Sequence, residues 1–425
     1  MEGVIMKAKL ISKDSKEVVI QITVSLESTM LKTEESIQFA LNQAGCLATE
    51  VALSGYDTNG SPIVVDGVNH TSKGQVEKTY QTPYGEVCLP RHVYQNYLGG
   101  KTYCPLEKDA KIIVQSTPKF AKMTSSKYAS NGGRIVQKDL NENHGRYISR
   151  NYIKDISDAV GGIVLNKAEQ WSYLPPVPLE RVKVIALGLD GTCMFMSGDG
   201  WRQAMVGTIA FYGEDGQRLD TIYLSAAPEY GKTRFISEFE KEIKDIKTIY
   251  PDADYVGVAD GAKDNWTFLS KHTECEILDF FHASEYVTKV ADVIWRAKAK
   301  RSKWLTDSCH KLKHEKNGAK ELLKEFIGYR SRKMNVDKKE KLESAITYFS
   351  NHLLIMNYSD YIKKNYPIGS GVTEAACKVI VKQRLCNSGM KWKQQGAESV
   401  LCLRALNYSS NRWEQMWNKI DRYGI

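Results

Sequence analysis

The sequence lacks any long apolar run. No stretch approaches the roughly 18 uninterrupted apolar residues of a membrane-spanning helix, and the opening residues, MEGVIMKAKLISKDSKEV, lack the apolar core of a signal peptide. No two of the nine cysteines form a CxxC pair, so we expect reduced thiols and no structural disulfide. Only 11 prolines and no internal repeat or low-complexity tract are present, which excludes collagen-like, fibrous and disordered classes. We therefore expect a soluble, cytoplasmic protein.

The length of the chain predicts more than one domain. Its 425 residues exceed the roughly 250 that a single hydrophobic core accommodates. A hydrophobic content of 42% and 26% charged residues are typical of a globular protein with a sizeable core. We expect two or three domains.

Positive charge is concentrated in two stretches. Lysine and arginine outnumber the acids by 59 to 50, which gives a net charge of +9. The stretch from Tyr286 to Glu343 has 17 basic and 8 acidic residues, and Lys119 to Lys154 has eight basic and two acidic residues. Either stretch alone could be a solvated helix face. Two such stretches together favour a polyanionic partner such as nucleic acid.

The N-terminal part reads as a small α+β region. KAKLISKD and KEVVIQITVSL alternate apolar and polar residues as strands do, and helical spacing follows from Glu35 to Leu41, with an end predicted at Gly45. YQTPYGEVCLPRHVYQNY predicts a hairpin that turns between Pro83 and Gly85.

A basic helical segment comes next. GRIVQKDLNENH predicts a helix broken at Gly145, and SRNYIKDISDAV predicts a second helix capped by Ser149 and closed by Gly161 and Gly162. The spacing fits a helix-turn-helix, in which the second helix enters the major groove of DNA. Three residues at its start would then contact bases or phosphates: Arg150, Asn151 and Lys154. The alternative is a plain helical hairpin that supports a core.

A domain boundary is expected in WSYLPPVPLERVK, because the three prolines between Pro175 and Pro178 cannot continue a helix or lie in a central strand. After it, VKVIALGLDGT, YVGVADGA and CEILDFFH predict buried strands. A hairpin turning at Asp215 and Gly216 and an amphipathic helix through Phe235 lie between the first two. This order indicates a mixed α/β sheet.

Two of these strands carry an aspartate followed by glycine, Asp190 in LGLDGT and Asp260 in GVADGA. If the strands are adjacent and parallel, both carboxylates emerge at the carboxyl edge of the sheet, where open α/β sheets bind ligands. Such a pair would attract a divalent cation, and carboxylate oxygens suit Mg²⁺. The alternative is that each Asp-Gly is only a turn that closes its strand.

A third candidate acid is Glu374 in PIGSGVTEAACKVIVKQRL, in the first turn of a predicted helix. Lys378 and Lys382 follow at i+4 and i+8, so one helix face would offer an acid for a metal ion and two cations for phosphates. A simple surface ion pair is the alternative.

Other motifs are weaker. His282 stands three positions after Asp279 in LDFFHASEYV, where a hydrogen-bonded packing role competes with a catalytic one. His310 and His314 have helical spacing but no convincing further zinc ligands. SAAPEYGKT resembles a phosphate-binding loop only superficially, because Ala226 replaces the first glycine and Glu229 would repel a phosphate.

The sequence resembles the Kra-type bacterial insertion-sequence transposases, which are related to the Mutator-like group of DDE transposases. The similar text includes WRQAMVGTIAFYGEDGQRLDTIYLSAAPEYGKTRF, VGVADGAKDNWTFL, ILDFFHASEYV and PIGSGVTEAACKVIVKQRLCNSGMKWKQQGAESVLCLRAL, and it covers most of residues 182 to 415. TPYGEVCLPRHVYQNYLGGKTYCPLE also resembles the family's segment ahead of its helix-turn-helix.

The resemblance implies an α/β fold: an RNase H-like catalytic domain with an all-helical insertion, preceded by an α+β N-terminal region containing a helix-turn-helix. The expected domains are the N-terminal α+β region (1–115), the helix-turn-helix segment (116–172), the first part of the catalytic domain (180–285), the basic helical insertion (286–365) and the C-terminal helices of the catalytic domain (366–425).

The resemblance also implies a site. Asp190, Asp260 and Glu374 would be the catalytic acids and would hold two Mg²⁺ ions, for which Mn²⁺ would substitute. His282, in an element D/C-x-x-H, would be an active-site neighbour. Five basic residues would hold DNA phosphates: Lys378, Lys382, Arg384, Lys391 and Lys393. Trp266 and Trp392 could stack on an unpaired base, although packing is the simpler role for both.

The implied function is that of a DNA transposase, a polynucleotidyl transferase with endonuclease activity that cleaves transposon ends and joins them to target DNA. Its partners would be double-stranded DNA and further copies of the chain, at least a dimer, with no membrane. Its location would be the bacterial cytoplasm, at the nucleoid. Two alternatives stay open: a transposon-derived protein that binds DNA without cutting it, and a metal-dependent nuclease of the same fold without strand transfer.

Overall fold

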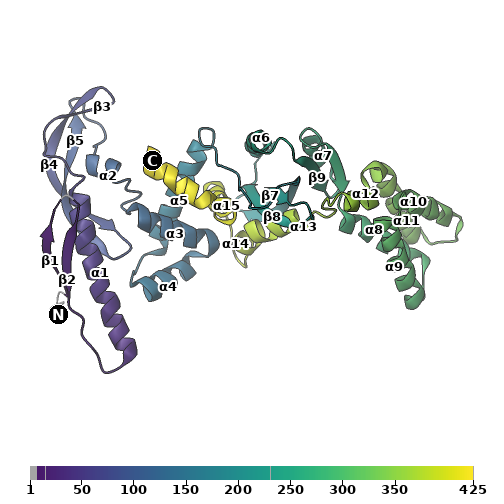
Figure 1. Cartoon of the computed structure of the whole chain (residues 1–425), viewed down its shortest axis with the longest axis horizontal. Helices are drawn as coiled ribbons and strands as arrows, with labels where there is room; N and C mark the ends of the chain where they lie inside the picture. The colour runs from purple at the N-terminus through teal and green to yellow at the C-terminus, as the bar shows by residue number, and fades with distance from the viewer. Residues whose placement is uncertain (1–6, 15, 230, 425) are drawn as a thin grey trace. The chain divides into compact units, whose positions relative to one another are not determined.

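The computed structural model describes residues 7–424 except positions 15 and 230, and it has the mixed α/β architecture expected from the sequence (Figure 1). The chain forms two units, each with its own internal packing. The first contains Met1–Ala168, Glu398–Asn407 and Trp413–Ile425, and the second contains Glu169–Ala397 and Tyr408–Arg412.

The first unit combines two small antiparallel sheets with helices. Its elements are β1 (Ala8–Lys13), β2 (Val18–Ile22), α1 (Met30–Ser54), β3 (Ile63–Val65), β4 (Val68–Gln81), β5 (Glu86–Asn96), α2 (Pro105–Asp109), α3 (Pro118–Ser130), α4 (Gly133–His144), α5 (Arg150–Lys167), most of α15 (Gln394–Tyr408) and most of α16 (Arg412–Tyr423). β1 pairs with β2, and the other sheet has the order β3-β4-β5. The hairpin predicted around Pro83 to Gly85 joins β4 to β5, where Gln81 pairs with Glu86.

Helix α1 continues nine residues beyond Gly45, so the predicted helix end there is wrong. Gly45 instead allows close packing within the helix. A Cβ at Gly45 would lie 2.3 Å from Cγ of the Tyr84 ring, in the hairpin between β4 and β5. Only a residue without a side chain lets the helix approach this ring.

Helices α4 and α5 are the predicted helical pair. Gly145 ends α4 in the left-handed conformation, with φ of 63°, and the Ser149 hydroxyl caps α5 by accepting a hydrogen bond from the Tyr152 N–H at 3.2 Å. The predicted end of α5 at Gly161 and Gly162 is wrong, because the helix runs on to Lys167. Gly161 instead gives α15 room to approach, since a Cβ there would lie 2.7 Å from Cβ of Ser399.

The second unit is built on a five-stranded mixed sheet of order β10-β9-β6-β7-β8. Its strands are β6 (Val184–Met196), β7 (Gly200–Tyr212), β8 (Arg218–Ala226), β9 (Asp254–Ala259) and β10 (Cys275–Leu278). β6, β7 and β8 form an antiparallel meander with the predicted turn at Asp215 and Gly216, β9 runs parallel to β6, and β10 runs parallel to β9.

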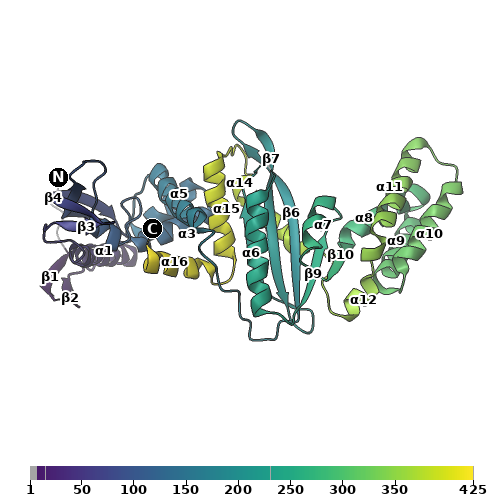
Figure 2. The same ribbon diagram turned by 90° about the horizontal axis from the view of Figure 1, so that it is seen from above.

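Both faces of this sheet are covered. On one face, α6 (Thr233–Ile249) lies along the strands (Figure 2), and with α7 (Lys263–Leu269) it packs aromatic residues such as Phe239 and Phe268 on Ile185 and Leu187. On the other face, Val184 and the neighbouring strands pack against helices that follow β10. Burial on both faces explains why the strands read as continuous apolar runs.

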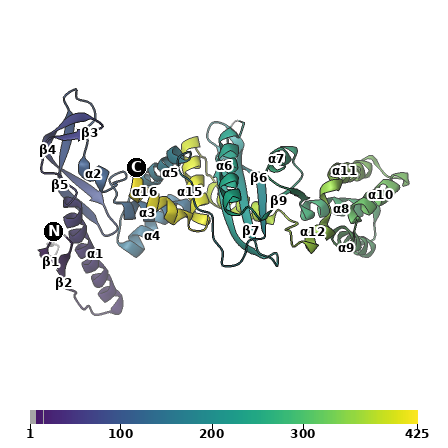
Figure 3. The ribbon, with the colours of Figure 1, turned by 45° about the horizontal axis from the view of Figure 1, so that its top comes forward.

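The stretch expected to be a helical insertion is helical, and its helices gather into one group (Figure 3). They are α8 (Phe280–Ile294), α9 (Lys298–His314), α10 (Gly318–Gly328), η1 (Tyr329–Ser331), α11 (Val336–His352), η2 (Leu353–Ile355) and α12 (Tyr358–Lys363). After α12, three short helical segments adjoin one another between residues 371 and 385: α13 (Gly371–Ala376), the π-helical η3 (Cys377–Lys382) and α14 (Gln383–Leu385).

The two units divide the chain differently from the predicted domains. The boundary after residue 115 falls inside the first unit, and the boundaries before residues 286 and 366 fall inside the second, the former within α8. The C-terminal helices were expected in the catalytic domain, but most of α15 and α16 belongs to the first unit. There the Arg404 guanidinium, which is buried, donates to the Ala129 carbonyl at 2.6 Å, and Lys122 pairs with Glu414.

All nine cysteines are free thiols. Among the helices of the described residues, none is both long and apolar enough to cross a lipid bilayer.

Candidate active site

Asp190 and Asp260 emerge at the same edge of the sheet. β6 and β9 are adjacent and parallel, as the prediction required, and their last paired residues are Leu187 and Gly257. Each aspartate lies three positions further along its strand direction. The expectation that both strands end at the acid holds only for Asp260, because β6 continues to Met196 and pairs Asp190 with Val206 of β7.

Gly188 lets helix α13 lie against this edge. The glycine shares a sheet face with Asp190, and a Cβ there would be 2.0 Å from Thr373 Oγ1. The Thr373 hydroxyl also forms a hydrogen bond of 2.7 Å with the Thr208 hydroxyl of β7. This close approach brings Glu374, the next residue of α13, to the same edge.

Asp279 fixes the turn that precedes α13. Its side chain is 0% exposed, and it caps α8 by accepting a hydrogen bond from the His282 N–H at 2.7 Å. Its other carboxylate oxygen accepts a hydrogen bond from the Ser370 N–H, and the Phe280 N–H donates to the Ile368 carbonyl at 2.8 Å. One buried carboxylate therefore holds both the helix that carries His282 and the turn that leads to Glu374.

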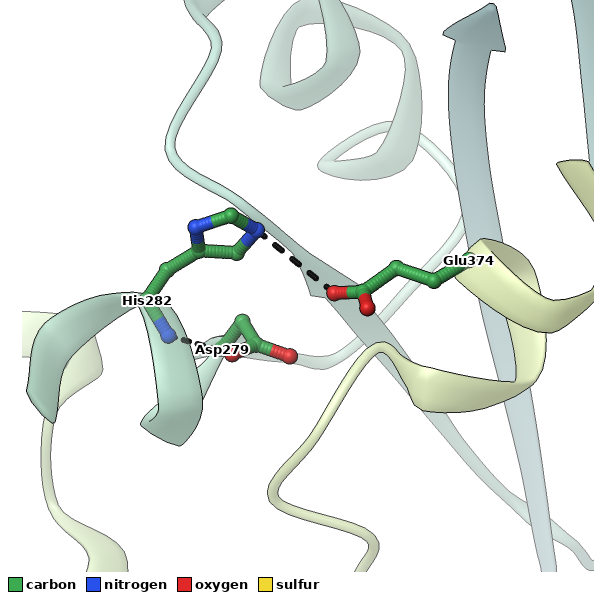
Figure 4. A group of neighbouring side chains, drawn as sticks. All are labelled: Asp279, His282 and Glu374. Atoms are coloured by element: carbon green, nitrogen blue, oxygen red, sulfur yellow. Dashed lines mark hydrogen bonds and ion pairs between the residues drawn. The ribbon is translucent and has the colours of Figure 1, made fainter. Parts of the chain in front are cut away.

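Glu374 and His282 meet in front of Asp279 (Figure 4). Nε2 of His282 lies 3.5 Å from Oε1 of Glu374, and the Ser370 hydroxyl donates to the same oxygen at 3.0 Å. Among the described residues, Asp279, His282 and Glu374 are the only three side chains whose potential ligand atoms all lie within 4.8 Å of one another. Asp190 and Asp260 do not belong to this closest set.

The pKa of the Asp190 carboxyl depends on the other two candidate acids. Burial raises the pKa of the Asp190 carboxyl, and the charges of Asp260 and Glu374 raise it further. Hydrogen bonds from the Gly191 N–H at 2.6 Å and the Cys377 thiol at 3.5 Å oppose this increase in the pKa. The part of this increase in the pKa that comes from Asp260 and Glu374 reflects their negative charge, which a bound cation would offset.

The donor set fits a hard divalent cation. Three carboxylates come from separate elements, Asp190 from β6, Asp260 from the end of β9 and Glu374 from α13. Mg²⁺ prefers oxygen ligands and is typically held by a few carboxylates, with water and substrate phosphates completing the coordination. Burial and the neighbouring Asp190 carboxylate raise the pKa of the Cys377 thiol, which donates a hydrogen bond to Asp190.

The helical insertion contacts Asp260 directly. The Tyr348 hydroxyl of α11 donates to the Asp260 main-chain carbonyl at 3.0 Å. The ring of Tyr348 stacks on Tyr286 of α8, with ring centroids 3.8 Å apart, and Nζ of Lys289 lies 3.8 Å from the centroid of the Tyr286 ring.

Sequence analysis did not identify these supporting roles. The position of Asp279 at a strand-to-helix junction, three residues before His282, was a usable N-cap signal. Nothing in the sequence pointed to Tyr348, because its partner Asp260 is 88 residues away.

The basic residues after Glu374 are not equivalent. Lys378 and Lys382 are exposed and lie on the π-helical η3 that follows α13. Lys391 and Lys393 are exposed as well. Arg384 is only 3% exposed, with its guanidinium 5.2 Å from the centroid of the Trp392 ring, so the prediction that it holds a surface phosphate is not supported.

The two tryptophans considered for base stacking take part in packing. Trp392 is partly buried and its indole N–H donates to the Leu385 carbonyl at 2.9 Å, and Trp266 is partly buried against both cores of the second unit.

On α5, Arg150, Asn151 and Lys154 are all exposed in the first two turns, as DNA contacts would need. Lys154 pairs with Asp158 one turn later, so binding a phosphate would compete with this ion pair. Helices α3 and α4 both pack on α5 in the same unit.

The weaker motifs can now be judged. The rings of His310 and His314 lie 4.8 Å apart, but neither belongs to a set of three possible metal ligands among the described residues. At the start of α6, the Glu229 carboxylate accepts a hydrogen bond from the Phe235 N–H at 2.9 Å. A carboxylate therefore occupies the position where a bound phosphate would sit, which agrees with the exclusion of a phosphate-binding loop.

A scan of the chain against models of known protein families found no match, and a search of curated proteins found no relative. The function therefore has to be argued from the site.

Proposed function

We propose that the chain is a DDE transposase, which cleaves the ends of a transposon and joins them to target DNA with the help of Mg²⁺. The observation that supports this most directly is the convergence of Asp190, Asp260 and Glu374 on one edge of the sheet in the second unit. The three acids are 70 and 114 positions apart in the sequence, so only the fold brings them to this edge.

The sheet supports an RNase H-like catalytic domain. An antiparallel meander of β6, β7 and β8 is followed by β9 and β10, which run parallel to β6. This arrangement puts the strand of the first acid beside the strand of the second. The helical segment from α8 to α12 then separates the second acid from the third, as the resemblance to the Kra-type family implies.

Asp190, Asp260 and Glu374 would hold the two metal ions. When bound, Mg²⁺, or Mn²⁺ in its place, lowers the pKa of a water or 3′-hydroxyl nucleophile and stabilises the charge on the leaving oxygen. The chain supplies the geometry: Asp279 holds the turn before α13, and His282 restricts the Glu374 carboxylate from 3.5 Å. No side chain needs to act as a nucleophile.

DNA would be bound at two places. In the second unit, exposed lysines follow Glu374: Lys378, Lys382, Lys391 and Lys393. In the first unit, Arg150, Asn151 and Lys154 would contact double-stranded transposon ends from α5. Two ends must be cut in concert, so at least a dimer on DNA is expected.

The experiment is cleavage and joining of labelled DNA that carries the element's own ends, with Mg²⁺ and with EDTA. Asp260→Asn should abolish both products and leave DNA binding largely intact, because it removes one ligand charge without changing side-chain size. Asp264→Asn is the matched control, since Asp264 is an exposed acid four residues away in the first turn of α7. Full cleavage by Asp260→Asn would contradict the proposal.

The same assay separates the alternatives. Metal-dependent cleavage without joined product would indicate a nuclease of the same fold. Binding without cleavage in well-folded wild-type protein would indicate a DNA-binding protein derived from a transposon.

A further inference from the structure

An open cavity of about 300 Å³ lies at the far end of the β6–β7 hairpin and has no part in the site described above. Phe195 of β6 and Trp201 of β7 form one wall, and the loop after α14 forms the other. Phe195 is five residues beyond Asp190 on the same strand. At 3.3 Å per residue, Phe195 lies roughly 17 Å from Asp190 along β6, and because the two residues are an odd number of positions apart, their side chains point to opposite faces of the strand.

The aromatic wall is exposed but held in place. Trp201 is 66% exposed, although a tryptophan ordinarily contributes its large apolar surface to a core. It stands directly opposite Phe195 in the antiparallel ladder, and the two rings meet edge to face with centroids 5.7 Å apart. An exposed indole ring is therefore carried by a strand, which is a rigid support.

The opposite wall is fixed to the same strand. The Trp392 N–H donates to the Phe195 carbonyl at 3.2 Å, and the Ser197 N–H donates to the Trp392 carbonyl at 2.7 Å. These bonds anchor the loop that supplies Asn387, Ser388 and Met390 to the cavity.

The charge of the cavity indicates the kind of ligand. Nζ of Lys391 lies 5.8 Å from the centroid of the Phe195 ring, at the edge of the cavity, and none of the described residues that line it is acidic. A flat aromatic platform next to a cation matches a nucleobase joined to a phosphate. An acidic or purely apolar peptide would use only one of these two features.

We propose that this cavity binds one unpaired nucleobase of the DNA substrate, stacked on Trp201, with the adjoining phosphate near Lys391. This inference rests on the proposed function and adds a site for single-stranded DNA further along β6 from the metal site. At 3.4 Å per nucleotide, 17 Å corresponds to about five nucleotides of a B-form strand, and to fewer where the strand is extended. The bound base would therefore lie a few positions from the reacting phosphodiester.

The test is the affinity of the full chain, in EDTA, for a twelve-nucleotide oligo-thymidine strand and for a blunt duplex of the same length. Trp201→Ala should weaken binding of the single strand by about 5- to 150-fold, the loss expected when one stacked base is removed. Trp201→Phe keeps a smaller ring, so its affinity for the single strand should lie between those of wild type and Trp201→Ala. Binding of the duplex should change less than twofold.

Tyr97→Ala is the matched control, since Tyr97 is 84% exposed and lies in the first unit. Unchanged thermal melting should accompany every variant. Equal single-strand affinity for wild type and Trp201→Ala, or no binding of the single strand by wild type, would overturn the inference. Because the assay needs no metal ion or cleavage, its failure is distinct from retained cleavage by Asp260→Asn, which would refute the proposed function.

Discussion

Two neighbouring glycines of α5 should respond in opposite ways to the same substitution. Gly161 and Gly162 are both helical, and replacing either by alanine removes the entropic penalty of glycine, which favours the helix by about 0.8–1.0 kcal/mol. At Gly162, a Cβ would have no atom within 4 Å. Gly162→Ala should therefore raise the free energy of unfolding of the first unit by up to about 1 kcal/mol.

At Gly161, the added Cβ would lie 2.7 Å from Cβ and 2.8 Å from Cα of Ser399. The Cα atom belongs to the backbone of α15, so the clash cannot be relieved by rotating a side chain. Overpacking of this kind costs about 1–3 kcal/mol. Because the helix gain is common to both variants, the clash alone should separate their free energies of unfolding by about 1–3 kcal/mol, with Gly161→Ala the less stable.

Hydrogen exchange of peptides from α5 and α15 under mild denaturant is the suitable measurement, since a whole-chain melt would mix the two units. Gly161→Ala should accelerate exchange in both helices, and Gly162→Ala should slow it or leave it unchanged. Equal protection in the two variants would refute the argument that Gly161 exists for close packing.

Two further predictions concern single polar contacts, one at Asp260 and one at Asp139. Tyr348→Phe removes the hydrogen bond to the Asp260 carbonyl but keeps the ring stack, and should slow metal-dependent cleavage by about 2- to 10-fold. Tyr286→Phe is the control, because it changes the other ring of the stack. A similar loss of cleavage rate in Tyr286→Phe would show that the hydrogen bond is irrelevant. The ion pair with Lys127, whose Nζ lies 2.6 Å from Oδ2, holds the pKa of Asp139 below its usual value of 3.8. Because the folded pKa is lowered, this stabilisation is present above the unfolded pKa and is lost as the pH falls through the folded pKa. Asp139→Asn should therefore lower the free energy of unfolding by about 0.5–1 kcal/mol at pH 7. In urea unfolding, the difference between variant and wild type should shrink as the pH is lowered below 3.8 and vanish below the folded pKa of Asp139.

The sequence was most informative where local pattern and packing agree. The strands that carry Asp190 and Asp260 are buried on both faces, so continuous apolar runs identified them. Their parallel pairing was only a condition of the prediction, and the structure meets it. Glu374 was found from its place in the first turn of a helix. In each case the signal lay within about ten residues of the acid.

The errors share a different cause. Glycine marks a helix end and also a place where another element comes close, and only the tertiary structure distinguishes the two. Gly145 ends a helix, whereas Gly45 and Gly161 lie inside helices against Tyr84 and Ser399. The burial of Arg384 and the π-helical turn after Glu374 are likewise set by packing, which no local pattern of residues encodes.

The hydrogen bond between Asp279 and Ser370 spans 91 positions of the chain. The loop it closes contains helices α8 to α12, and the entropy lost in joining such distant segments is recovered only when those helices have folded against one another. Asp190 and Asp260 can take their places on the sheet without this closure, but Glu374 cannot. During synthesis from the N-terminus, Glu374 would therefore be the last of the three acids to arrive, and under the proposed function a nascent chain that lacks it would be unable to cut.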